Sequence, residues 1–101
     1  MHLLLKHPLV DCDVEEAAVW YHQRDPRVAV RLVDETRRAM RSAAENPFYY
    51  FVCFDDIRRV RLHRFPHSVF FKVSDNTVFV LAVLHGAREV EELIQGRSTS
   101  D

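Results

Sequence analysis

The sequence predicts an α+β fold in which an antiparallel helix hairpin packs on a mainly antiparallel four-stranded sheet, in the order β-α-α-β-β-β(-α). Three observations carry this prediction. Apolar residues recur at helical spacing through residues 10–43, with one break at Asp25-Pro26. After Asn46-Pro47 the chain consists of extended apolar runs separated by turn residues. The length of 101 residues, with 48% hydrophobic side chains, suits a single domain over residues 1–101 with one core.

The first half begins with His2-Leu3-Leu4-Leu5, which suits a short, buried first strand. Pro8 fits the first turn of the first helix, where a missing backbone N–H costs nothing. Asp25-Pro26 supplies the N-cap and first residue of the second helix, and Asn46-Pro47 ends it. The apolar stripes of the two helices are Val10, Val14, Ala17, Ala18 and Tyr21, then Val28, Leu32, Thr36, Ala39, Met40 and Ala43. The exposed side of the second helix is expected to carry the ion pairs Arg31–Glu35 and Asp34–Arg38.

The second half is expected to hold strands over residues 57–62, 68–73 and 78–84, followed by a short helix over Ala87–Ile94. Strand alternation places Arg59 and Arg61 on one face and Arg58, Val60 and Leu62 on the other. Residues 96–101 are expected to form a frayed tail. The aromatic run Phe48-Tyr49-Tyr50-Phe51 has two interpretations that stay open: a flap of the core over the sheet edge, or a surface for a partner.

The charge is nearly balanced, with 14 basic and 15 acidic residues and a formal net charge of −1, so the chain as a whole is not a polycation. Its distribution is uneven, because residues 57–72 hold five basic residues and no acid. These are Arg58, Arg59, Arg61, Arg64 and Lys72. A sheet with an arginine-rich face is a binding surface for carboxylate or phosphate. The alternative is that these arginines only solvate the strands and pair with acids of the helices.

Several classes of protein are not expected. No apolar run is long enough to span a bilayer, and the N-terminal apolar stretch is too short for a signal peptide, so we expect a cytoplasmic protein without membrane contact. The two cysteines, Cys12 and Cys53, do not make a disulfide framework. His63 and His67 lack the spacing of a metal site, and no glycine-rich loop could hold a phosphate, so we expect no metal and no cofactor.

The sequence resembles the ParE/RelE toxin superfamily, and most closely its ParE branch, the plasmid stabilisation proteins. The marks in the second half are the strand start Ile57-Arg58-Arg59, the corner Arg64-Phe65-Pro66, an apolar fourth strand and the run Val83–Glu89. The first half agrees in His7-Pro8, Asp13, Trp20-Tyr21 and the second helix bounded by proline. The resemblance covers residues 3–94. It implies the toxin of a bacterial type II toxin–antitoxin pair, neutralised by an antitoxin with an acidic C-terminal segment.

The resemblance implies two different activities within the superfamily. ParE toxins poison DNA gyrase and are not enzymes. From charge and position in this sequence, we expect the surface that engages gyrase to include Arg58, Arg59, Arg61, Arg64 and Arg88. RelE toxins are ribosome-dependent endoribonucleases that cleave mRNA without a metal. Here the corresponding catalytic residues would be Arg59, Arg61, Arg64, His85 and Arg88.

The sequence departs from the RelE pattern at two positions. Ser68 stands where RelE has an arginine, and Ile94 lies near the position of the catalytic aromatic residue. A near-neutral charge is also a poor match to an RNA-dense target. The gyrase-directed interpretation is therefore favoured over the ribosome-directed one. A toxin fold that binds a partner without poisoning anything is a third interpretation, and the apolar patches also allow a homodimer when antitoxin is absent.

Overall fold

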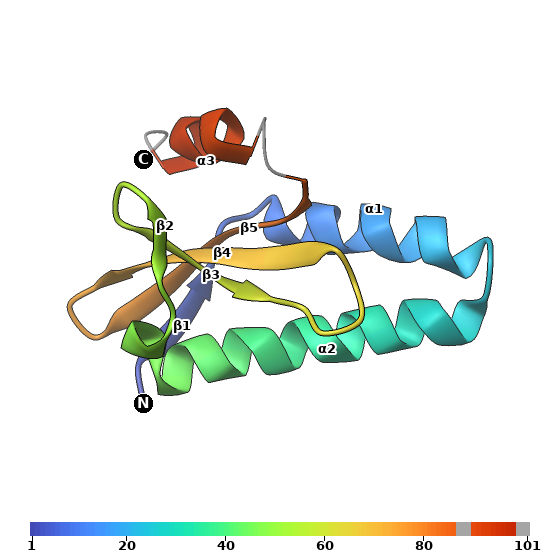
Figure 1. Cartoon of the computed structure of the whole chain (residues 1–101), viewed down its shortest axis with the longest axis horizontal. Helices are drawn as coiled ribbons and strands as arrows, with labels where there is room; N and C mark the ends of the chain where they lie inside the picture. Colours follow the sequence, from blue (N-terminus) through green and yellow to red (C-terminus); the bar gives the residue numbers. More distant parts are fainter. Residues whose placement is uncertain (87–89, 99–101) are drawn as a thin grey trace.

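A computed structural model describes residues 1–86 and 90–98 of the chain, and Figure 1 shows their arrangement. A five-stranded sheet runs in the order β1-β5-β4-β3-β2, with β1 parallel to β5 and the other neighbours antiparallel. In chain order the elements are β1 (Leu3–Lys6), α1 (Val10–His22), α2 (Pro26–Glu45), the 3-10 turn η1 (Pro47–Tyr49), β2 (Val52–Phe54), β3 (Ile57–Arg61), β4 (His67–Ser74), β5 (Thr77–His85) and α3 (Val90–Ser98). The predicted α+β class and helix hairpin are confirmed.

The helix α2 begins and ends where the sequence predicts. The Asp25 carboxylate accepts the backbone N–H of Arg27 at 3.0 Å, and Pro26 occupies the first helical position. Asn46 terminates the helix, and Pro47 opens η1. The shorter helix α1 begins at Val10, two residues after Pro8, and turns directly into α2 to form the hairpin.

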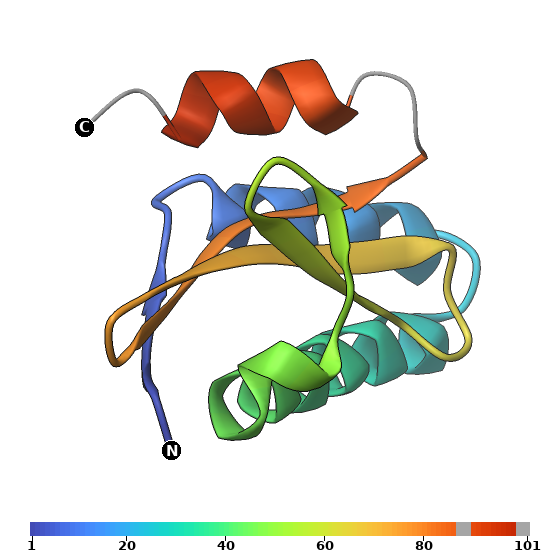
Figure 2. The same cartoon turned by 60° about the vertical axis from the view of Figure 1, so that its left-hand side comes forward.

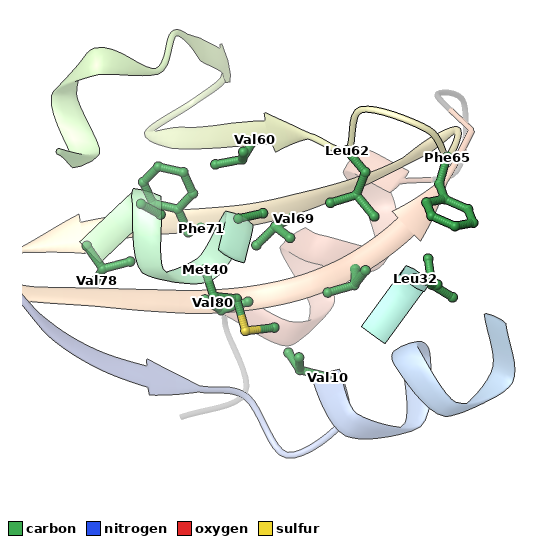
Figure 3. Packing of buried hydrophobic residues seen from close by; sticks show 13 residues of the cluster. Val10, Leu32, Met40, Val60, Leu62, Phe65, Val69, Phe71, Val78 and Val80 are labelled. Atoms are coloured by element: carbon green, nitrogen blue, oxygen red, sulfur yellow. The ribbon is translucent and has the colours of Figure 1, made fainter. Parts of the chain in front are cut away.

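The helix hairpin covers one face of the sheet, and α3 covers the other (Figures 1 and 2). The larger core cluster joins Leu32 and Met40 of α2 and Val10 of α1 to the sheet, as Figure 3 shows. Its sheet residues are Val60, Val69, Phe71, Val78, Val80 and Val83, and Leu62 and Phe65 join it from the connection between β3 and β4. The smaller cluster lies under α3 and consists of Ile57, Phe70, Leu81, Ala82, Val90 and Ile94. The buried strands β4 and β5 therefore separate two apolar layers.

The first strand differs from its prediction. The three leucines of β1 were expected to be buried, but Leu3 is 58% exposed and Leu5 is 46% exposed. The reason is that β1 pairs in parallel with β5 at the edge of the sheet, beyond most of the cover of the helices. A run of three leucines signals a strand but does not tell an edge strand from a central one.

The second half shows two further differences. The sheet has five strands and not four, because Val52–Phe54 pairs with β3 through a hairpin in which Asp55 has φ +48°. The aromatic run before it is no core flap, since Phe48, Tyr49 and Phe51 are 65–90% exposed and only Tyr50 packs against the core. None of the helices in the described part of the chain combines the length and apolar character needed to cross a membrane.

The expected frayed tail is also corrected. Residues 96–98 continue α3, and Arg97 is held in an ion pair that the sequence did not predict. Residues 99–101 lie outside the described residues.

Candidate functional site

The arginines predicted to form a binding surface do not share one face of the sheet. Arg58 is on the hairpin face, where its Nη1 donates to the Tyr50 carbonyl at 2.6 Å and its Cζ lies 5.1 Å from the centre of the Phe48 ring. This guanidinium therefore holds the segment after α2 against the sheet. Arg88 lies outside the described residues.

Arg59 is on the opposite face, as strand alternation requires. Its cross-strand neighbour is Phe70, a member of the cluster beneath α3. It is half-buried, and its positive charge lies close enough to Cys53 to oppose the rise in the pKa of that thiol, a rise caused mainly by burial. Arg58 and Arg59 thus act on different faces of the sheet.

Arg61 and Arg64 lie together at the end of β3 and in the connection to β4. Both are exposed, and both line a groove whose other wall is the middle of α2. The Oε1 atom of Glu35 on α2 accepts the backbone N–H of Arg64 at 3.0 Å and that of His63. These two hydrogen bonds tie the connection to the helix.

Of the two ion pairs predicted on α2, one is present. Arg38 Nη2 lies 2.8 Å from the Asp34 carboxylate. The predicted Arg31–Glu35 pair is absent from the ion pairs of the described residues, because Glu35 points to the β3–β4 connection and bonds its backbone. Arg31 instead lines the same groove as Arg61 and Arg64.

His85 lies in a second cleft, between α1 and the end of β5. Its ring is 5.4 Å from that of His67, and Glu16, Trp20 and Tyr21 line the same cleft. The Nδ1 atom of His67 is buried and has no hydrogen-bond partner among the described residues. Burial, and then the neighbouring His85, lower the pKa of His67 below its ordinary value of 6.5.

The residues of the ribonuclease interpretation are therefore not brought to one point. His85 faces the cleft beside α1, whereas Arg59 lies across the sheet from it on the α3 face. Ser68 is buried in β4, opposite Arg61. Ile94 is fully buried against the sheet, so a side chain at this position cannot stack on a nucleobase.

An ion pair between Asp13 and Arg97 is the arrangement that sequence reasoning missed. Arg97 Nη1 and Nη2 donate to the two Asp13 oxygens at 2.6 and 2.9 Å, and both side chains are about 90% buried, with 9% and 10% exposed. Asp13 also accepts the N–H of Val83, and Arg97 also donates to the Leu81 carbonyl. The hydrogen bonds that Arg97 donates to the Asp13 carboxylate raise the pKa of Arg97 above its ordinary value, so the guanidinium stays charged. Two residues 84 positions apart leave no local signal of this contact.

The described ranges, 1–86 and 90–98, were predicted to hold no metal ion. They contain no group of three or more histidine, cysteine, aspartate or glutamate side chains arranged to hold a metal ion. Both cysteines are free and exposed.

The family model for the ParE toxin of the type II toxin–antitoxin system parDE matches residues 4–90. The chain belongs to the ParE toxin family. A search of curated proteins finds no match. Among solved structures, a chain from the chromosomal ParDE TA system of P. aeruginosa is similar, with a TM-score of 0.75 and 16% identity over 86% of this chain and 98% of that chain. At this identity the likeness shows the fold alone, which is the fold described above.

The family match places the ParE pattern on β1 through β5 and ends at Val90, the first residue of α3. The arginines that line the groove beside α2, Arg31, Arg38, Arg61 and Arg64, all lie within the matched residues 4–90. Arg97 lies beyond the matched range. The ion pair between Arg97 of α3 and Asp13 of α1 therefore joins a residue outside the range matched by the family model to a residue inside it.

Proposed function

We propose that this ParE family toxin poisons DNA gyrase and is neutralised by a cognate antitoxin with an acidic C-terminal segment, as part of a plasmid stabilisation system in the bacterial cytoplasm. Membership of the ParE family carries the proposal. A formal net charge of −1 is compatible with a protein target and unfavourable for an RNA-dense one. Arg61 and Arg64, which are exposed and lie together at the end of β3, supply the cations for the contact with gyrase. Arg58 and Arg59 lie on opposite faces of the sheet and cannot both join that contact.

The alternative is a ribosome-dependent endoribonuclease that uses Arg59, Arg61, Arg64, His85 and Arg88. General acid–base work and phosphate stabilisation need these groups around one scissile bond. The separation of Arg59 from His85 across the sheet speaks against this alternative. A toxin fold without toxicity is the third candidate, and induced expression without a growth defect would favour it.

The decisive experiment is a DNA supercoiling assay with purified gyrase and the purified toxin. We expect loss of supercoiling and accumulation of cleaved DNA, and a weaker effect from the variant Arg61→Ser with Arg64→Ser. An unaffected gyrase, together with codon-specific mRNA cleavage in a translating extract, would replace this proposal with the ribonuclease alternative. The free toxin is expected to form a homodimer through its exposed apolar segments, such as Leu3–Leu5 and Phe48–Phe51.

A further inference from the structure

A cleft between α1 and the ends of two strands takes no part in the gyrase-directed function proposed above. It has a volume of about 630 Å³, within the range of sites that take ligands. Figure 1 shows α1 running past the start of β4 and the end of β5, and the cleft lies between them. Glu16 and Trp20 line it from α1, and His67 and His85 line it from the strands.

The sheet brings the two histidines of the cleft together. His67 is the first residue of β4, His85 is the last residue of β5, and the register pairs the two directly across the strands. Residues paired in this way point to the same face of the sheet, and the ring centres of this pair lie 5.4 Å apart. The His67 carbonyl also accepts the backbone N–H of Leu62 at 3.0 Å, so the backbone beneath this ring is fixed on both sides. Spacing along the chain gives no sign of the pair, because the strand register creates it.

The separation of the two rings fits one metal ion held between them. A histidine nitrogen binds Zn²⁺ at about 2.0–2.1 Å, and the ring centre lies about 1.2 Å further away, so each ring centre is about 3.2 Å from the ion. Two such rings at a tetrahedral angle have centres about 5.2 Å apart. The separation of 5.4 Å between His67 and His85 is close to this value, so coordination requires rotation of the side chains and no movement of the strands.

One nitrogen of the pair lacks a partner in the protein. The Nδ1 atom of His67 is buried and makes no hydrogen bond within the described residues. Nearly all buried polar atoms of native proteins have a partner, so an exception needs an explanation such as a bound ion. Burial and the neighbouring His85 lower the pKa of His67, which keeps this ring in the neutral form that binds metal ions.

The charges around the cleft favour a cation. The carboxylate of Asp13 is neutralised by Arg97 in the buried ion pair described above. Glu16 is exposed and forms no ion pair with any described residue. The described side chains that line the cleft include no lysine and no arginine. The unbalanced charge of the cleft wall is therefore negative, which attracts a metal ion.

We infer that His67 and His85 form a site for one transition-metal dication of the zinc, nickel and copper class, with water in the remaining positions. Imidazole nitrogens suit these ions, whereas Mg²⁺ and Ca²⁺ take oxygen ligands. No third histidine, cysteine, aspartate or glutamate of the described residues joins the site, so its open positions can take ligands from outside the chain. A cation held only by the folded chain stabilises the fold, because it joins the start of β4 to the end of β5.

The test adds nickel chloride to the untagged, EDTA-treated protein and follows binding by isothermal titration calorimetry. We expect one nickel ion per chain. The dissociation constant should be at least about tenfold higher for His85→Gln and for His67→Phe, which corresponds to about 1.4 kcal/mol. His85 is exposed, so its substitution leaves the fold intact, and circular dichroism checks the fold of both variants. Magnesium chloride is the control ion and should not bind; equal binding of magnesium would assign oxygen ligands and overturn the inference.

The matched control variants are His63→Gln and His22→Gln, which remove exposed histidines from outside the cleft. Both should keep the affinity for nickel within about twofold. Copper(II) at a small fraction of the protein concentration should broaden the NMR amide signals next to His67 and His85 before any others. An equal loss of affinity in the control variants, or unchanged affinity in His67→Phe and His85→Gln, would overturn the inference, because histidines elsewhere would then hold the ion. Broadening that begins at another histidine would overturn it as well.

This metal site and the proposed function are tested separately. Inhibition of gyrase by the EDTA-treated protein bears only on the target, and nickel binding bears only on the histidine pair. Either result can therefore fail while the other stands.

Discussion

Breaking the ion pair between Asp13 and Arg97 should destabilise the protein more than any exposed ion pair can. Arg97→Ala leaves the Asp13 carboxylate about 90% buried with one donor, the N–H of Val83, and leaves the Leu81 carbonyl without its side-chain donor. Removing one partner of such a buried pair costs about 3–5 kcal/mol. A domain of this size is stable by about 5–15 kcal/mol, so the loss is a large fraction of the total.

Urea unfolding followed by circular dichroism measures this loss. With a slope of about 1–2 kcal/mol per molar urea, the midpoint should fall by about 1.5 M or more. The matched control is Lys6→Ala, which removes an ion pair of similar length, 2.9 Å, whose side chains are 44% and 79% exposed. That change should cost at most about 1 kcal/mol, since water and salt screen the pair.

A double variant, Asp13→Ala with Arg97→Ala, tests the cause of the effect. It leaves neither charge buried alone, so it should be less destabilised than the sum of the two single variants. If Arg97→Ala unfolds within about 0.5 kcal/mol of Lys6→Ala, the pair does not hold α3 to α1 and the reasoning is refuted.

Three other predictions concern a histidine, a cap and an exposed ring. The pKa of His67 is lowered by burial and by His85, so its contribution to stability is present above about pH 6.5 and is lost as the pH falls through its lower folded pKa. The free energy of unfolding should therefore drop on acidification, and His67→Phe should weaken that dependence on pH. Asp25→Ala should lower the free energy of unfolding in urea, because the N-cap acceptor is lost. Hydrogen bonds from the Arg27 side chain and backbone lower the pKa of this carboxyl below its ordinary value of 3.8, so the effect should be fully present at neutral pH and should be lost only as the pH falls through that lower folded pKa. Phe51→Ser should leave stability within about 0.5 kcal/mol, as this ring is 90% exposed, and should reduce self-association in sedimentation; an unchanged sedimentation profile would remove this segment from the proposed homodimer.

The helices are the most predictable part of the fold, because residues next to each helix end determine where the helix begins and stops. Asp25-Pro26 and Asn46-Pro47 fix both ends of α2 through a cap and a proline, and each acts within a few residues. The position of β1 in the sheet was not predictable in this way. Whether Leu3–Leu5 is central or at an edge depends on pairing with Thr77–Val80, which lies more than 70 positions away.

The candidate site was predictable only as far as its residue types. Arg61 and Arg64 are exposed in the structure. Helical spacing pairs Glu35 with Arg31, whereas in the structure Glu35 accepts the backbone N–H groups of His63 and Arg64. The tertiary contact forms in place of the local ion pair because two hydrogen bonds to backbone N–H groups stabilise the fold more than a single exposed ion pair does. The ion pair between Asp13 and Arg97 was not predictable, because no local sequence pattern connects residues 84 positions apart.

The alternation that makes a strand predictable also limits what its arginines can do. Consecutive residues of β3 must point to opposite faces, so Arg58 and Arg59 cannot join one surface in any fold that keeps this strand. Arg58 accordingly binds the Tyr50 carbonyl, and Arg59 lies near the cluster under α3. Arginines can gather only where the alternation ends, at Arg61 and in the connection that follows it. There Glu35 holds the connection against α2, so that Arg61 and Arg64 lie across one groove from Arg31 and Arg38.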